Sequence, residues 1–498
     1  MNRPSVTGTS SIFFQVLIAK PHKIAYTDGS SQEEGDWVMF SKAQAWLEDA
    51  FTTQQFTYKQ LRSMYFTLLL DTFFIMFIGV LSSAMVSSTG EAAMAAVNMV
   101  GSVNSLVSLV FSALATGGSI VIARAKGRGD EDGIRMAIGE SIFLCGGVAL
   151  VLSSMLFIFS KLLIGMLYPR AEPLLTSYSI QYMRLMAVSF VPFSVFNVIF
   201  FAFRSTGDTR SSLFLTIFIN TLHLLCSFLF INGMKLGVTG AGLSYIVART
   251  LGMAVALVWM LKVHNEYHIR VSSMFHFSKD ITSQIVQLGV PIASESALFQ
   301  GGMLLVQIYL AYLTTTDLAA HGVANSVFGL FLATGNAMTS FATTVCGQCY
   351  GAGLYELTRR YCRKIIAAGR VLMLAVAVIF LAASPLILKL YNPSENALPI
   401  IWKCLAIGSI GLPIIWCDGY ITPMTLRTAG DATFSTVVSV VSLAVGRIVI
   451  GYILTIVVGL GVPGVWLGMM CEWLIRAVLM RRRLNGDKWL HIKEAKAA

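Results

Sequence analysis

Six charged side chains interrupt long apolar stretches of this 498-residue sequence. An ionisable residue inside a membrane-spanning helix costs about 3 kcal/mol or more, so each is a candidate functional residue that faces the protein interior. A carboxylate or a guanidinium in such a place can bind a proton or a charged solute. The six residues are Asp71, Arg249, Glu295, Arg447, Glu472 and Arg476.

Two of these acids stand at equivalent places in two similar halves of the sequence. The segment Thr67-x-x-x-Asp71 matches Pro291-x-x-x-Glu295 at a separation of 224. Burial favours the neutral acid, whereas an incoming organic cation favours the carboxylate, so such a pair can bind a proton and a cation in alternation. The alternative is that both acids lie near the cytoplasmic interface and are simply hydrated, because only a turn or two precedes them.

The remaining four charges are predicted to have structural or cavity-lining roles. Glu472 and Arg476 are four positions apart and can pair on one helix face, with Arg447 in the preceding span, which favours a structural ion network. Arg249 has no identifiable partner and is either structural or lines a cavity. Neutral polar residues also bind helices together, and packing is the simpler role for each of five that could line a cavity. These five are Gln300, Gln307, Asn325, Asn197 and Asn220.

The elements that position these side chains are predicted to be membrane-spanning helices. Charged residues are 12% and hydrophobic residues 56% of the chain, whereas soluble domains carry roughly a quarter charged residues. Apolar stretches of about 20 residues can cross a bilayer as helices whose backbone groups are satisfied internally. Twelve such stretches lie near 64–87, 95–122, 136–168, 178–203, 211–233, 238–262, 285–313, 318–345, 365–391, 398–424, 434–458 and 462–480.

The basic residues act as topology signals. They follow the even-numbered stretches, as at Arg124, Arg204 and Arg427, and are sparse in the opposite loops. The positive-inside rule therefore predicts that both termini are cytoplasmic. Because the net charge of +11 is distributed in this way and forms no single patch, we expect no nucleic-acid partner.

An internal repeat organises the chain. Gly127-x-Gly129 matches Gly351-x-Gly353 at a separation of 224, and the Arg-x-x-Gly-Asp motif at 204–208 recurs at 427–431. Each half holds an even number of spans, so the two halves have the same orientation. The sequence thus predicts an all-α membrane protein with two six-helix bundles. A pseudo-two-fold axis along the membrane normal relates them, and the substrate site lies between them.

The predicted boundaries follow from this repeat. Residues 1–60 form a cytoplasmic tail that either rests on the membrane surface or stays unstructured, and residues 61–265 form the first bundle. A cytoplasmic linker covers 266–284, the second bundle covers 285–484, and a cytoplasmic tail covers 485–498.

Several motifs resemble the MATE (multidrug and toxic compound extrusion) family over residues 60–488. They are Leu318-Ala319-Ala320-His321, Gly347-Gln348-x-x-Gly351-Ala352-Gly353, the two Arg-x-x-Gly-Asp motifs, and Gly-Val-x-Gly before spans 6 and 12. The segment 446–469 looks most like the bacterial branch called YeeO-type. Many prokaryotic members place an aspartate late in the first helix, where this chain has Ser82. Asp71, about three helical turns earlier, lies on nearly the same helix face.

The resemblance implies a secondary antiporter of the bacterial inner membrane. It would export drugs, organic cations or a metabolite by alternating access in exchange for protons, or less favourably sodium. A flippase for a lipid-linked precursor is the alternative. An enzyme is not predicted, because no nucleophile or metal cluster is present and Cys346-x-x-Cys349 lacks a second pair. The glycine-rich loops lack nucleotide-binding residues and are interpreted as helix caps and turns. The predicted partners are therefore a small solute, a coupling ion and membrane lipid, with no nucleotide, cofactor or metal.

Overall fold

The computed structural model describes residues 48, 51–87, 91–169, 172–264, 266–269, 278–391 and 393–490. Most of the predicted tail 1–60, the side chain of Ser82, much of the linker 266–284 and residues 491–498 lie outside the described residues. The chain divides into two compact units that part between Thr67 and Leu68. The contacts below all lie within the second unit.

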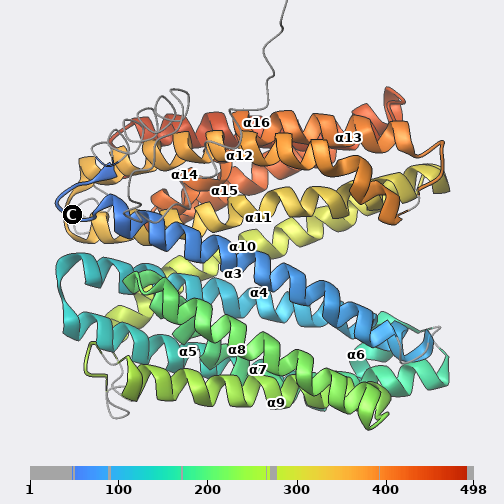
Figure 1. The fold of residues 1–498 in the computed structure, drawn as a ribbon, viewed down its shortest axis with the longest axis horizontal. Coiled ribbons are helices and arrows are strands. Elements are labelled where there is room, and N and C mark those ends of the chain that lie inside the picture. Colours follow the sequence, from blue (N-terminus) through green and yellow to red (C-terminus); the bar gives the residue numbers. More distant parts are fainter. Residues whose placement is uncertain are drawn as a thin grey trace, which may run out of the picture. The chain divides into compact units, whose positions relative to one another are not determined.

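The described residues are helical along almost their whole length (Figure 1). The first half contains α3 (Tyr58–Ser87), α4 (Glu91–Arg128), α5 (Glu131–Ile158), α6 (Ser160–Leu167), α7 (Pro173–Thr206), α8 (Thr209–Ser227), η1 (Phe228–Gly233), α9 (Gly237–Val258) and η2 (Trp259–Val263). The second half contains α10 (Lys279–Leu310), α11 (Thr315–Gly351), α12 (Tyr355–Tyr391), α13 (Leu398–Gly411), η4 (Leu412–Trp416), α14 (Cys417–Thr428), α15 (Ala432–Ser442), η5 (Leu443–Ile450), η6 (Ile453–Val457) and α16 (Val462–Asn485).

Eleven helical segments of the described residues are long and apolar enough to cross a membrane. The 32-residue helix α10, which carries Glu295, takes the place of the twelfth. Short π-helical turns join some segments, so that α13, η4 and α14 form one span. The all-α fold predicted from the sequence is confirmed. Several helices extend one or two turns beyond the predicted apolar stretches, because their polar ends stay helical.

The Arg-x-x-Gly-Asp motif explains how two of the spans end. Gly207 and Gly430 both have φ of 96°, a backbone conformation that glycine adopts easily and other residues rarely do. The aspartate precedes the next helix in both copies. Asp208 accepts a hydrogen bond from the backbone N–H of Ser211 at 3.1 Å, whereas Asp431 makes no such bond and pairs with Arg483 at 2.7 Å. The repeated motif therefore ends one helix, turns the chain at the glycine and begins the next helix at the aspartate.

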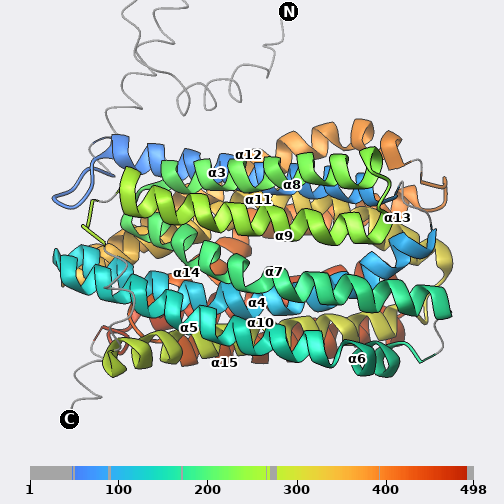
Figure 2. The same cartoon turned by 90° about the horizontal axis from the view of Figure 1, so that it is seen from below.

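The two halves meet along α4, α10 and α11. Helix α10 packs against α15 of its own half and against α4 and α5 of the other, an arrangement visible in Figure 2. Helix α11 packs against α12 and α14 and also against α4. The first two helices of the second half are therefore the ones that join the bundles.

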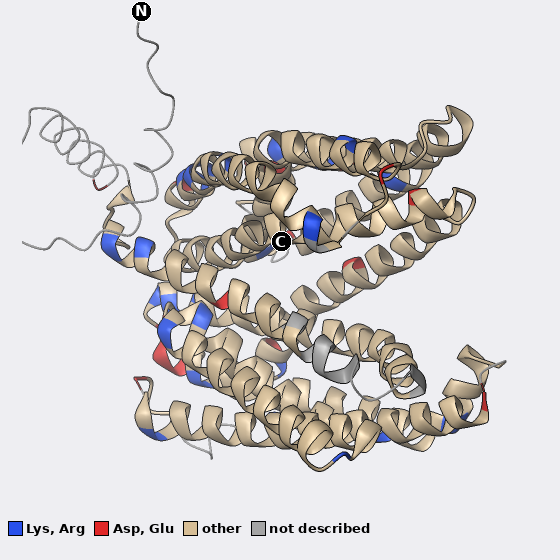
Figure 3. Cartoon of the chain, turned by 45° about the vertical axis from the view of Figure 1, so that its right-hand side comes forward, with Lys and Arg blue, Asp and Glu red and all other residues tan. Residues whose placement is uncertain are grey.

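We call the end of the helices where residues 129–130, 207–208, 352–354 and 429–431 join the spans the linker end. Basic residues gather there, while the helices themselves are mostly uncharged along their length (Figure 3). The predicted membrane-spanning character of the helices agrees with this distribution.

Helices α4 and α11 approach each other closely at the linker end. A side chain at Gly127 would collide with the backbone of Gln348, and one at Gly351 with the backbone of Arg124. Interpreting these glycine loops as caps and turns is correct for Gly129, whose φ is 70°. For Gly127 and Gly351 it is incomplete, because these two glycines allow two helices to touch.

Candidate functional site

A cavity of about 220 Å³ lies between the two bundles near the linker end. Four helices line it: α4, α7, α11 and α14. The lining residues are Thr116, Ser119, Phe201, Arg204, Ser205, Thr339, Ser340, Thr343, Thr344 and Met424. Seven of the ten carry hydroxyl groups and one carries a charge. We call this cavity the central pocket.

The lining of the central pocket follows the internal repeat. Thr116 and Ser340 are separated by 224 in the sequence, as are Ser119 and Thr343. Each bundle therefore contributes the same kind of side chain from an equivalent helix, which places the pocket where a pseudo-two-fold axis would pass. The pocket is symmetric in its hydroxyl groups but not in charge, because Arg204 lines it and its counterpart Arg427 does not.

Asp71 is fully buried and forms an ion pair with Arg204. The guanidinium of Arg204 also lies over the ring of Phe200, 4.3 Å from its centroid. The second carboxylate oxygen of Asp71, Oδ1, has no hydrogen-bond partner in the described part of the chain. Asp71 therefore reaches the central pocket only through its partner Arg204.

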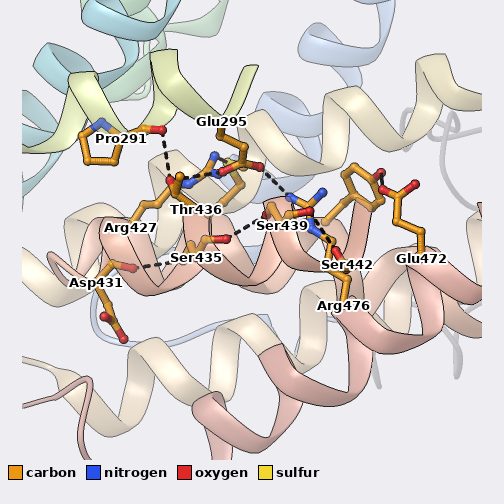
Figure 4. Close-up of polar contacts among 12 residues, drawn as sticks. Pro291, Glu295, Arg427, Asp431, Ser435, Thr436, Ser439, Ser442, Glu472 and Arg476 are labelled. Carbon is orange, nitrogen blue, oxygen red and sulfur yellow. Dashed lines mark hydrogen bonds and ion pairs between the residues drawn. The ribbon is translucent and has the colours of Figure 1, made fainter. Parts of the chain in front are cut away.

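Glu295 lies in a denser group of charges in the second bundle (Figure 4). One carboxylate oxygen pairs with Arg427, and the other accepts from Nη2 of Arg476 at 2.8 Å. Thr436 donates to Glu295 at 3.4 Å and to the carbonyl of Pro291 at 3.0 Å. This acid therefore has two positive partners.

The ion network in α15, η5 and α16 differs from the one that spacing predicted. Arg447 Nε lies 2.6 Å from Glu472 Oε2, while Arg476 pairs with Glu295. The phenol of Tyr420 donates to the other oxygen of Glu472 at 3.3 Å. The predicted pairing of Glu472 with Arg476 is wrong, because a guanidinium on a neighbouring helix reaches each acid.

Two arginines that contact the acids, Arg204 and Arg427, were missed as site residues and interpreted as topology signals. They are the first residues of the two Arg-x-x-Gly-Asp motifs and recur at a separation of 223, while their acids recur at 224. A paired search for acids and bases that recur at the repeat spacing would have found them. The two ion pairs are thus repeats of one another.

The five neutral candidates for cavity lining lie outside the central pocket. Asn325 is exposed on α11, whose linker-end half supplies Ser340 and Thr343 to the pocket, and Gln300 and Gln307 are exposed on α10. Asn197 is buried and donates to Ser112 at 3.2 Å, and Asn220 donates to a carbonyl of its own helix. Asn197 therefore joins two packed helices, whereas the bond of Asn220 stays within its own helix.

The contacts that close the linker end also repeat. Arg124 Nε of α4 donates to the carbonyl of Thr428 at 2.6 Å, where α14 ends. Gln348 of α11, which stands at the repeat position of Arg124, donates to the carbonyl of Ser205 at 2.8 Å, near the end of α7. Thr344 donates to the carbonyl of Arg204 itself at 3.0 Å. Each bundle therefore holds the end of the helix that carries the other bundle's acid-binding arginine.

A polytopic helical protein with two repeated bundles, a pocket between them and buried ion pairs beside it belongs to the class of membrane transporters built from repeats. A model of the MatE family matches residues 68–229 and 291–453, which span both halves. The chain belongs to this family.

Curated relatives and solved structures agree with this assignment. An uncharacterized transporter of Bacillus subtilis, YisQ, is 23% identical over 86% of this chain and 94% of its own length. A probable multidrug resistance protein NorM of Thermotoga maritima is 24% identical, over 83% of this chain and 89% of its own. The crystal structure of a mutant form of the Vibrio cholerae MATE transporter VcmN matches with a TM-score of 0.79 at 18% identity, covering 87% of this chain and 98% of that one. The predicted two-bundle fold is thereby confirmed.

Proposed function

We propose that this protein is a secondary antiporter of the bacterial inner membrane that exports small organic solutes in exchange for protons. The observation that supports this most strongly is the repeated pair of carboxylate and arginine, Asp71 with Arg204, which lines the central pocket, and Glu295 with Arg427 in the second bundle. The bundle limits 61–265 and 285–484, and a cytoplasmic linker end, are part of the proposal.

The pairs link ion binding to the contacts between the bundles. A proton on Asp71 neutralises it and releases Arg204 from its partner. The carbonyl groups of Arg204 and Ser205 accept hydrogen bonds from Thr344 and Gln348 of the other bundle. Movement of Arg204 therefore weakens these hydrogen bonds between the bundles. When they break, the central pocket opens at the linker end, which is the second state that alternating access requires.

A proton suits this site better than sodium. A sodium ion would have to replace its hydration shell with several oxygen ligands, whereas the guanidinium of Arg204 already occupies one carboxylate oxygen of Asp71. A proton needs only one carboxylate oxygen, and Oδ1 of Asp71 is available.

The solute class follows from the relatives and the pocket. The NorM relative is described as a probable multidrug resistance protein, which favours drugs, organic cations or a metabolite as solutes. A lipid-linked precursor flippase would need more positive charge than one arginine among ten lining residues supplies. Closer kinship to the YeeO-type branch remains a prediction.

Transport in everted membrane vesicles tests the proposal. Vesicles with the wild-type protein should accumulate ethidium when the vesicle lumen is made acidic. A sodium gradient alone should not drive this accumulation. Vesicles with Asp71→Asn should accumulate as little as vesicles without the protein. Accumulation driven only by sodium, or none under either gradient with a panel of cationic and anionic dyes, would contradict the proposal.

A further inference from the structure

The guanidinium of Arg249 lies in the middle of a membrane span, and no carboxylate of the described residues pairs with it. Arg249 lies about 18 Å along α9 from the start of the helix and is 6% exposed. A buried charge at this depth is costly unless it is paired. The contacts of this guanidinium therefore bear on its function.

All contacts described for Arg249 are with uncharged groups. Nη1 donates to Ser189 at 2.7 Å and Nη2 donates to Oδ1 of Asn104 at 3.4 Å. The guanidinium lies 4.2 Å from the ring centroid of Phe193 and 4.8 Å from that of Tyr245. Among the residues that the structure describes, no carboxylate lies within ion-pair distance of it.

The other buried arginines are balanced. Arg204, Arg427, Arg447 and Arg476 each pair with a carboxylate. Arg124 binds carbonyl groups where α14 ends, which is the negative end of a helix dipole. Arg249 differs from the four paired arginines because its described partners are aromatic faces and neutral oxygens, and it differs from Arg124 because those oxygens belong to side chains and not to the end of a helix.

We propose that Arg249 binds the carboxylate group of an organic solute. Two of the five N–H donors of a guanidinium are used by Ser189 and Asn104, which leaves donors for a carboxylate. Asn104, Phe193 and Tyr245 are only half-buried, and the two rings offer flat surfaces to an aromatic ligand body. This inference rests on the proposed transport function and adds one class of solute to the organic cations tested above: aromatic anions or zwitterions that carry a carboxylate.

Three probes with one aromatic skeleton isolate the role of charge: 2-naphthoate, 2-naphthamide and 2-naphthylmethylammonium. Their affinities for the full-length protein in detergent are measured by isothermal titration calorimetry. The wild type should bind the carboxylate about tenfold or more tightly than the amide, in line with a charge-assisted bond. Arg249→Lys should retain part of this preference, and Arg249→Gln should lose it.

A second variant keeps Arg249 and gives it a carboxylate partner from the protein itself. Asn104→Asp places a carboxylate beside Nη2, so it should raise the melting temperature and abolish the preference for 2-naphthoate. Asn325→Asp, which adds an acid on exposed α11, is the matched control and should leave the preference unchanged. A wild type without preference for the carboxylate, or a preference that survives in Asn104→Asp, would overturn the inference.

The binding test is independent of transport. If gradient-driven accumulation fails in vesicles while the carboxylate preference holds, the proposed function is wrong and the site stands. If cationic dyes accumulate and the preference is missing, the antiporter stands and Arg249 is structural.

Discussion

The two equivalent acids of the bundles differ in their number of guanidinium partners. Asp71 of the first bundle has one guanidinium partner, Arg204, whereas Glu295 of the second has two, Arg427 and Arg476. The extra partner comes from α16, where Arg476 stands at the repeat position of Gly252 in α9. The acid and its first arginine are therefore repeated in both bundles. The second arginine, Arg476, is present in the second bundle alone.

This asymmetry indicates a division of labour. One proton on Asp71 removes the only carboxylate that Arg204 has, and Arg204 lines the central pocket. Protonating Glu295 would leave two buried guanidinium groups facing each other, which is much less favourable. In the proposed mechanism the first bundle therefore exchanges the proton, and the second bundle keeps its ion pairs.

The largest effect should come from Asp71→Asn. The amide resembles the protonated acid and cannot cycle, so gradient-driven export should fall by about tenfold or more, a barrier change of about 1.4 kcal/mol. The protein should still insert and remain monodisperse. Asp71→Glu, which keeps the charge, should be milder. Export at wild-type rates by Asp71→Asn would break the comparison.

Glu295→Gln should cost stability more than transport. It leaves Arg427 and Arg476 without their carboxylate, and breaking a buried pair costs about 3–5 kcal/mol. The melting temperature in detergent should fall further than for Asp71→Asn, which orphans one guanidinium only. Equal shifts in the two variants would argue that the second bundle is not the more rigid one.

Two double mutants sharpen the account of the second bundle. Glu472→Ala alone should destabilise by about 3 kcal/mol, because it orphans Arg447. Adding Arg447→Ala should recover part of the loss, whereas adding Arg476→Ala should deepen it, because Glu295 then keeps only one of its two guanidinium partners. Thermal unfolding of these three variants, with the wild type as the reference, measures both effects. Recovery with Arg476→Ala instead would restore the pairing expected from helix spacing.

The smallest effect is expected at the surface. Lys126 and Glu266 pair at 3.2 Å, but their side chains are 31% and 56% exposed. Such pairs contribute about 0–1 kcal/mol, so Lys126→Ala should change the melting temperature little and leave export unchanged. A large loss of export here would show that charge near the linker matters more than the buried pairs.

The sequence predicted the architecture well because hydropathy and repeat spacing report directly on membrane spans. The repeat spacing matched Asp71 with Glu295, and each acid pairs with an arginine. Their role in ion coupling stays a prediction. Spacing along one helix could not find those arginines, because Arg204 and Arg427 reach the acids from other helices. For the same reason, Glu472 and Arg476 suggested a pair on one helix face that does not form.

Sequence patterns also could not predict the contacts that join the two bundles at the linker end. Gly127 and Gly351 look like turn residues, and only the crossing of α4 with α11 gives them a packing role. Backbone carbonyl acceptors, such as those of Ser205 and Thr428, carry no signal in side-chain type.

The central claim is that the pair of Asp71 with Arg204 keeps the linker end closed, and a distance between the bundles tests it most directly. Asp132 of α5 and Glu356 of α12 are exposed and stand at equivalent positions of the repeat, so Asp132→Cys and Glu356→Cys can carry spin labels once the eight native cysteines are replaced. Acidification should lengthen the label distance measured by pulsed electron resonance. Asp71→Asn should show the longer distance already at neutral pH. Identical distance distributions in both proteins at every pH would contradict the account.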